Sequence, residues 1–173
     1  MNGRKFFGNQ NTRYGKAHEK RALWCFARGY PKSLINMNLG FCVNGKAPMF
    51  GFSGDGVMDG HTLLEVKCPI AGKKYRKCEL CRRIRYLKER KDGTFELNRN
   101  HTYYTQIQLG LAVMNLTAAK FLVYYKNTTT KKKKKTTVEG VIEFNIERDD
   151  VFMYNMMFTL HIRYFSIYST VSS

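Results

Sequence analysis

The strand-like segment 63–68, with the sequence Leu-Leu-Glu-Val-Lys-Cys, places the strongest constraint on the fold of this chain. Successive side chains of a β-strand point to opposite faces of the sheet. Glu65 and Lys67 therefore project from one face, while Leu64, Val66 and Cys68 project from the other. An apolar face has to be covered, so the segment predicts a sheet strand that packs on another layer and carries an acid and a base on its opposite side.

The remaining periodic segments predict the order helix, sheet, helix, strands, helix. The first helix begins between Thr12 and Gly15 and ends near Arg28, the second covers Tyr103–Leu116, and the third follows Asp149 and runs to about Tyr164. Extended runs are expected at 39–43, 49–52, 56–58, 63–68, 120–125 and 138–144. Length and pattern favour one domain over residues 1–173, with a mixed sheet flanked by helices, of the α/β or α+β class.

The charge of the chain points to a polyanionic partner. Thirty Lys and Arg residues against thirteen Asp and Glu residues give a net charge of +17, which favours nucleic acid. A membrane surface is the competing partner, but the sequence shows no amphipathic basic helix to support it. It also shows no apolar run of membrane-spanning length and no signal-peptide pattern, so we expect an intracellular protein, nuclear or cytoplasmic.

Asp55, Glu65 and Lys67 form the candidate reactive group. Asp55 precedes a turn at residues 59–60 that can fold it back beside Glu65. Two carboxylates suit Mg²⁺, with the backbone carbonyl of Val66 as a further ligand. Lys67 could position or help deprotonate a metal-bound water, or hold a phosphate. On spacing alone, a surface hairpin with a Glu65–Lys67 ion pair fits equally well.

Three blocks of sequence resemble the YqaJ-type viral recombinase and lambda-exonuclease-like branch of the PD-(D/E)XK nucleases. Residues 53–56 read Ser-Gly-Asp-Gly, where that family has Ser-Pro-Asp-Gly, and residues 65–69 read Glu-Val-Lys-Cys-Pro. Residues 103–108 read Tyr-Tyr-Thr-Gln-Ile-Gln and are similar to the family's Tyr-Tyr-x-Gln-x-Gln helix. Residues 15–19 read Gly-Lys-Ala-His-Glu, similar to its Gly-x-x-x-Glu helix.

This resemblance implies a restriction-endonuclease-like α/β fold and Mg²⁺- or Mn²⁺-dependent cleavage of DNA. It implies a 5′ to 3′ exonuclease on double-stranded ends in viral or mobile-element recombination, with a single-strand annealing recombinase as a partner. The alternatives are an endonuclease acting on DNA or RNA and a nucleic-acid-binding module without catalysis. The implied catalytic residues are Asp55, Glu65, Lys67 and Gln106, and the implied metal ligands are Glu19, Asp55, Glu65 and Val66.

Two details of the resemblance concern Gln106 and Gly54. Gln106 and Gln108 lie about 200° apart on a helix, so only one of them can face the metals, and the family motif selects Gln106. Gly54 stands where the family usually has proline. Because proline would stiffen the turn that carries Asp55, glycine is expected to loosen that turn and lower activity.

Basic residues near these blocks are candidates for binding DNA phosphates. They are Arg13 and Lys16 beside Glu19, and Lys73, Lys74, Arg82 and Arg83 in a basic insertion at about 70–91. Such contacts predict little sequence specificity and strong salt dependence. A Lys-rich loop is expected at about 127–137, either as a solvated loop without a further role, as a phosphate contact, or as a nuclear import signal.

The five cysteines do not suggest a disulfide framework, because the chain is expected to be intracellular and their number is odd. Cys78 and Cys81 form a CxxC pair within the basic insertion. Zinc would need two further ligands, and an iron–sulfur cluster would need further cysteines, none of which follows Cys81. We therefore expect surface thiols there rather than a zinc or iron–sulfur site.

Overall fold

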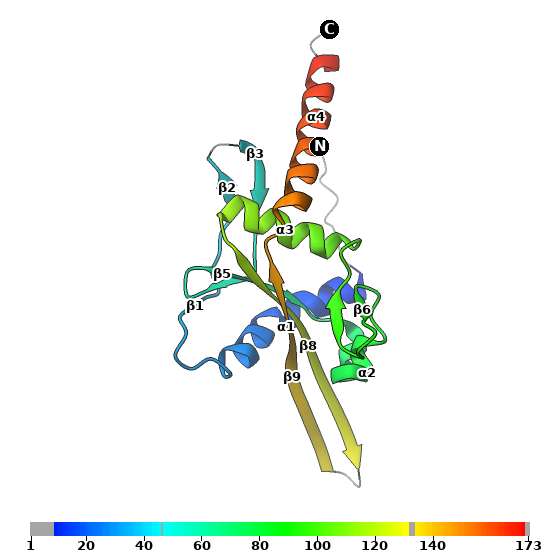
Figure 1. Cartoon of the computed structure of the whole chain (residues 1–173). Helices are drawn as coiled ribbons and strands as arrows, with labels where there is room; N and C mark the ends of the chain where they lie inside the picture. The colour runs from blue at the N-terminus through cyan, green and yellow to red at the C-terminus, as the bar shows by residue number, and fades with distance from the viewer. Residues whose placement is uncertain (1–8, 46, 132–133, 172–173) are drawn as a thin grey trace, which may run out of the picture.

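The computed structural model describes residues 9–45, 47–131 and 134–171. A five-stranded sheet with the order β1-β4-β5-β8-β9 lies at its centre and helices pack around it (Figure 1). The predicted mixed sheet flanked by helices is thus confirmed. The elements are α1 (Gln10–Ala27), β1 (Ile35–Asn36), β2 (Cys42–Asn44), β3 (Ala47–Phe52), β4 (Gly56–Met58), β5 (Thr62–Lys67), η1 (Ile70–Lys73), α2 (Lys77–Cys81), β6 (Leu87–Glu89), β7 (Phe95–Leu97), α3 (Thr102–Met114), β8 (Ala118–Lys131), β9 (Lys134–Glu147) and α4 (Asp150–Val171).

β5 is the middle strand of the sheet and organises its neighbours. It pairs antiparallel with β4 and parallel with β8, and β8 pairs antiparallel with β9. The parallel register places Glu65 opposite Phe121 and Lys67 opposite Val123. The β5–β8 connection contains α3, as expected of a parallel crossover.

Two apolar layers sit on opposite faces of β5. On one face, Leu23 and Phe26 of α1 pack with Leu64 and Tyr124. On the other face, α3 and the small β6–β7 hairpin pack over a second cluster that includes Leu63, Leu80, Leu97, Ile107, Leu111 and Phe121. The alternation expected for β5 is therefore what divides the core: its even-numbered residues face α1 and its odd-numbered residues face α3.

The predicted Lys-rich loop at about 127–137 is wrong for its described residues, and residues 132–133 lie outside them. β8 and β9 stay paired over 127–131 and 134–137, with Thr128 opposite Thr137 and Thr130 opposite Lys135. Threonine is β-branched and favours extended backbone, so pairing that begins in the sheet continues outward. The resulting hairpin projects from the body of the molecule at the end opposite α4 (Figure 1).

Three other expectations need correction. The run at 39–43 is extended only from Cys42, and the short strand β1 was not predicted. α4 continues to Val171 rather than ending near Tyr164. Cys78 is exposed, but Cys81 is 4% exposed because the short helix α2 turns that side into the core, so only one of the two is a surface thiol.

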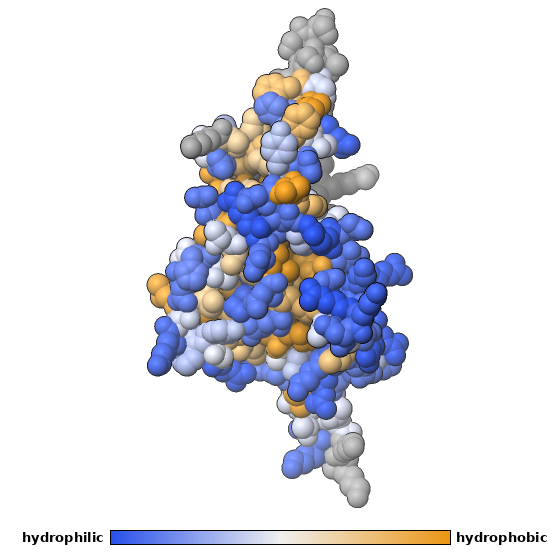
Figure 2. All heavy atoms as spheres, viewed as in Figure 1, coloured by the Kyte–Doolittle hydropathy of each residue, from blue (hydrophilic) through white to orange (hydrophobic). Residues whose placement is uncertain are grey.

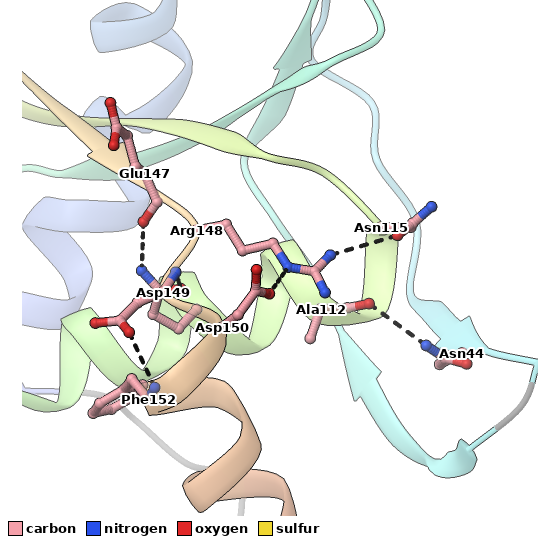
Figure 3. A network of polar contacts seen from close by, with 9 residues as sticks. Asn44, Ala112, Asn115, Glu147, Arg148, Asp149, Asp150 and Phe152 are labelled. Atoms are coloured by element: carbon pink, nitrogen blue, oxygen red, sulfur yellow. Dashed lines mark hydrogen bonds and ion pairs between the residues drawn. The ribbon is translucent and has the colours of Figure 1, made fainter.

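The junction between β9 and α4 is built by polar contacts (Figure 3). Asp149 Oδ1 accepts the Phe152 N–H at 3.0 Å, which caps the start of α4. Gln108, fully buried on α3, donates to the Glu147 carbonyl and accepts the Asp149 N–H, both at 2.9 Å. These bonds fix α4 to α3 and to the end of the sheet.

Most of the visible surface is hydrophilic, but apolar side chains appear along the projecting α4 (Figure 2). Tyr154 and Phe158 are 71% and 56% exposed there. Among the described residues, no helix combines the length and apolar character needed to cross a membrane.

Candidate active site

Glu65 and Lys67 point from β5 to the same side, as their spacing predicts. Glu65 is 1% exposed and forms an ion pair with Lys67. Gln106 Nε2 on α3 donates to the same carboxylate oxygen, Glu65 Oε1, at 2.8 Å. The Lys67 ammonium also lies 4.6 Å from the centre of the Tyr103 ring, one turn before Gln106, where a cation–π contact holds it.

Asp55 lies beside this group because the β4–β5 hairpin folds it back. The pairing of Gly56 with Leu64 brings the preceding residue, Asp55, to the level of Glu65. Asp55 Oδ2 accepts the backbone N–H of Val66 at 2.6 Å. This bond fixes the carboxylate on the strand, so the placement predicted from the turn is confirmed.

Glu19 joins the group from α1. Partial burial raises the pKa of Glu19, and the nearby negative charge of Asp55 raises it further, whereas Lys67 and Lys16 lower it. The same helix buries Leu23 one turn later, so Glu19 stands at the edge of an apolar face, as its spacing predicts. The structure thus brings Glu19, Asp55, Glu65, Lys67 and Gln106 together from two helices, a turn and a strand.

The acids of this group outnumber the base beside them. Burial raises the pKa of Glu65 to about 7; Lys67 opposes this shift, while Asp55 and Glu19 add to it. Burial alone would lower the pKa of Lys67, but the attraction and hydrogen bond of Glu65 outweigh it, and the net pKa is raised. Carboxylates that are partly buried and repel one another are costly to keep ionised, which is typical of functional sites.

A cleft with a volume of about 580 Å³ is lined by Glu19 and Lys67 of this group, whereas Asp55, Glu65 and Gln106 are not among its lining residues. Its walls are the first turns of α1 on one side and the end of β5 with the following η1 on the other. The lining includes Thr12, Lys16, Glu19, Val66, Lys67, Tyr86 and Tyr103. An acid, two ammonium groups and aromatic rings therefore face one another across a space large enough for a nucleotide.

The donor chemistry of the cluster fits a hard divalent cation. Glu65 Oε2 is buried and has no hydrogen-bond partner among the described residues, so it is an acceptor that a cation would satisfy. Carboxylate and carbonyl oxygens are the ligands that Mg²⁺ and Mn²⁺ prefer. In the described part of the chain no three His, Cys, Asp or Glu side chains already converge as a ligand set. Coordination would therefore require the carboxylates to turn from their present partners.

Gly54 precedes Asp55 in a crowded place. A Cβ atom at this position would lie 2.9 Å from Phe52 Cε1 and 3.0 Å from Leu63 Cδ1. The packing beneath the turn therefore suits glycine, and the bond from Val66 to Asp55 supplies an anchor for the turn.

The predicted phosphate-binding residues are distributed over three places. Lys16 lines the cleft, and Arg13 is exposed on the preceding turn of α1. Lys73 lies 4.6 Å from the centre of the Tyr14 ring, beside the cleft. The other three lie farther along the insertion. Lys74 and Arg83 make cation–π contacts with the Tyr75 ring, and Arg82 forms an ion pair with Glu89 at 2.9 Å. None of these three lines the cleft.

Tyr86 was not predicted as a site residue. Its hydroxyl is buried without a hydrogen-bond partner among the described residues, although the side chain lines the cleft. Its ring packs edge-on against Tyr103 at 5.1 Å between centroids. Tyr86 belongs to no recognisable motif, and a tyrosine in such a run is usually core, so no sequence pattern separates it from packing residues.

Comparison with known proteins supports the fold. No family model matches the sequence, and no curated protein matches it. The structure is similar to that of the alkaline exonuclease LHK-Exo from Laribacter hongkongensis, with a TM-score of 0.56, 16% identity, and coverage of 96% of this chain and 77% of that one. A structure of LHK-Exo in complex with dAMP gives a TM-score of 0.58 with the same identity and coverage.

A phage-related exonuclease from Haemophilus somnus 129PT is a further structural neighbour. Its TM-score is 0.51 and its identity 16%, with coverage of 87% of this chain and 66% of that one. These likenesses confirm the restriction-endonuclease-like α/β fold that the motif resemblance implies, and both neighbours are exonucleases.

Proposed function

We propose that this protein is a metal-dependent DNA nuclease, and specifically an exonuclease that degrades double-stranded DNA from its ends in the 5′ to 3′ direction. One observation carries the proposal: Glu65 is buried next to Asp55 and Glu19, with one oxygen held by Lys67 and Gln106 and the other without a hydrogen-bond partner in the described part of the chain. A purely structural carboxylate would have both oxygens satisfied.

The residues that would hold Mg²⁺ or Mn²⁺ are Glu19, Asp55, Glu65 and the carbonyl of Val66. Such an ion supplies neutralisation of charge on the scissile phosphate and a bound water of lowered pKa. Gln106 orients the Glu65 carboxylate by its bond to Oε1, which leaves Oε2 free to bind. The Val66 N–H holds Asp55 in place before substrate arrives.

Lys67 is placed to act on the substrate itself. Its ammonium lines the cleft and is held between Glu65 and the Tyr103 ring. From there it can donate to a non-bridging phosphate oxygen or position the attacking water. Because its pKa is raised, it stays protonated near neutral pH, which suits charge stabilisation better than proton removal.

The exonuclease mode is supported by the structural neighbours, which are exonucleases, one of them seen with a mononucleotide, dAMP. The proposal includes a role in viral or mobile-element recombination within the nucleus or cytoplasm, with a single-strand annealing recombinase as partner. A binding module without catalysis would not need Glu19, Asp55, Glu65, Lys67 and Gln106 in one cluster.

The test compares linear and covalently closed circular duplex DNA, each incubated with the protein and Mg²⁺ or Mn²⁺. Loss of the linear substrate alone supports the exonuclease, whereas nicked circles indicate an endonuclease, and parallel RNA substrates define the sugar preference. Asp55→Ala and Lys67→Ala should abolish cleavage, while Lys88→Ala, at an exposed position on β6, should not. DNA binding without any cleavage in either metal would contradict the proposal.

A further inference from the structure

The β8–β9 hairpin continues well beyond the sheet. β5 ends at Lys67, opposite Val123, and past that level β8 and β9 pair only with each other up to Lys131 and Lys134. We call the described residues 126–131 and 134–139 the arm. It extends away from the body as a two-stranded ribbon (Figure 1). Because β8 pairs with the strand that carries Glu65 and Lys67, the arm is a direct continuation of the sheet that holds the candidate active site.

The base of the arm is fixed to the body on both strands. On β8, Asn127 Nδ2 donates to the Lys74 carbonyl at 2.6 Å. On β9, Glu139 accepts the Tyr124 hydroxyl at 2.9 Å and forms an ion pair with Arg21 of α1. η1 packs so closely below that a Cβ atom on Gly72 would lie 2.8 Å from the Tyr124 carbonyl oxygen. The direction of the arm relative to the cleft is thus set by contacts at its base.

Lysines outnumber acidic residues on the arm, where the one carboxylate, that of Glu139, lies opposite Lys126. Lys134 and Lys135 are exposed and Lys126 is half-buried. Glu139 is the only acidic residue in the sequence from 126 to 139. Its ion pair with Arg21 and its bond from Tyr124 lower its pKa to about 2, so this carboxylate is already matched by a cation of α1.

A basic hollow connects the arm to the cleft. It has a volume of about 440 Å³ and is lined by Tyr14, His18, Lys73, Lys126 and Thr128, none of which is acidic. Tyr14 is the chain neighbour of Gly15, which lines the cleft together with Lys16, and the Lys73 ammonium, on η1 with the cleft-lining Ala71, lies 4.6 Å from the centre of the Tyr14 ring. Cationic groups therefore follow one another from the cleft through this contact of α1 with η1 and out along the arm.

We propose that the arm is a second DNA-binding element that grips the phosphate backbone of a duplex at a distance from the point of cleavage. This inference rests on the proposed function and names how its substrate is held. Lys135 pairs opposite Thr130, seven residues beyond Val123. At about 3.4 Å per residue this places it about 24 Å from the level of Lys67, which corresponds to about seven nucleotides along one DNA strand.

The test is a binding measurement without divalent metal, so that no cleavage takes place. The arm variant combines Lys126→Ala, Lys134→Ala and Lys135→Ala. The charge control combines Arg28→Ala, Lys32→Ala and Arg163→Ala, which removes the same number of cations, all from exposed positions outside the arm. Each protein is titrated with DNA hairpins that have a stem of six or of twenty base pairs, over a range of salt concentrations.

The arm variant is expected to bind the long stem on the order of tenfold more weakly than the wild type. The slope of log affinity against log salt concentration should become less steep by about 2 to 3. On the short stem it should bind like the wild type, because that stem does not reach the arm. Equal weakening on both stems, or weakening no greater than that of the charge control, overturns the proposal.

Cleavage of linear DNA by the same variants separates this inference from the proposed function. If the wild type binds the long stem through the arm but never cuts DNA, the arm proposal stands and the proposed nuclease function fails. If the wild type cuts DNA and the arm variant binds both stems as tightly as the wild type does, the proposed nuclease function stands and the arm proposal fails.

Discussion

Two acidic residues of this molecule contact glutamines of the same helix, Glu65 through its side chain and Asp149 through its backbone, yet their carboxylates are in opposite states. Gln106 bonds Glu65 at the cleft, and Gln108, two residues on, bonds the backbone N–H of Asp149 at the start of α4. Asp149 itself accepts from the Phe152 N–H, the Tyr104 hydroxyl and Arg99, and its pKa is lowered. Glu65 has one oxygen that no described residue bonds, and its pKa is raised to about 7.

The difference separates a carboxylate that supports the fold from one that is available for chemistry. At Asp149 the fold supplies partners for the ionised form, so the charge strengthens the junction (Figure 3). At Glu65 burial opposes the ionised form, and only Lys67 and Gln106 offset it. The Glu65 carboxylate therefore stabilises the folded protein less than a fully hydrogen-bonded carboxylate would. Such a loss of stability is usual at functional sites.

Glu65→Gln should have the largest effect on activity. It keeps the side-chain volume but removes the charge that a metal requires, so the cleavage rate should fall by about 10²- to 10³-fold or more. Thermal stability should change little, because removal of the buried Glu65 charge and loss of its ion pair with Lys67 act in opposite directions. Rates on linear duplex and melting curves of the same samples check both statements. Glu96→Gln, on β7, is the control, and a clear loss of stability in Glu65→Gln would remove the contrast with Asp149.

Gln108→Leu should have the largest effect on stability. It leaves the Glu147 carbonyl and the Asp149 N–H buried without their partners, and we expect a loss of about 2 to 4 kcal/mol in the free energy of unfolding. Gln106→Leu should do the reverse, with a reduced cleavage rate and a change in stability of less than about 1 kcal/mol. Denaturant unfolding and cleavage assays on the pair measure this; equal profiles for the two variants would contradict the division of roles along α3.

Glu139 is a second satisfied carboxylate and gives a prediction about pH. Its pKa is lowered from 4.5 to about 2, first by the bond from Arg21 and then by the bond from Tyr124. A depressed pKa contributes stability above the unfolded value, and that contribution is lost as the pH falls from about 4.5 toward 2. We expect about 2 kcal/mol, after allowance for partial exposure. Unfolding curves of wild type and Glu139→Gln at pH 7 and pH 3 should therefore differ more at pH 7; the same difference at both would contradict the assignment.

Gly54→Pro should have the smallest effect of the set. The family resemblance suggests that proline would stiffen the turn, but a Cβ atom here would lie closer to Phe52 and Leu63 than normal van der Waals contact allows, so these side chains would have to move. We expect a loss of about 1 kcal/mol in stability and no gain in cleavage rate. A more active and more stable variant would show that the turn is loose, as the sequence alone indicates.

The fold class and the candidate site could be predicted because both depend on short-range patterns. Alternation in β5 separates Glu65 and Lys67 from the apolar residues between them, and helical spacing separates Gln106 from Gln108. The turn before β4 carries Asp55 back to Val66, as its position beside a hairpin indicates.

What could not be predicted depends on partners distant in the sequence. The arm has no apolar alternation, and only the pairing of β8 with β9 makes it a ribbon. Cys81 lies in a basic stretch that predicts an exposed segment. Its neighbour Leu80 packs in the core, and Cys81 is buried with it. Tyr86 reaches the cleft because it packs on Tyr103, seventeen positions away in the sequence, and no local pattern contains that contact.

The most direct test of the central claim is the release of mononucleotides from a linear duplex labelled at its 5′ ends, followed over time with Mg²⁺ for wild type and Glu65→Gln. If the Glu65 oxygen that no described residue bonds binds the metal, the wild type should release mononucleotides steadily and the variant almost none. Both proteins should bind the duplex equally in the absence of metal. Equal release by both proteins, or none by a wild type that binds the duplex, would contradict the claim that Glu65 is the centre of a nuclease site.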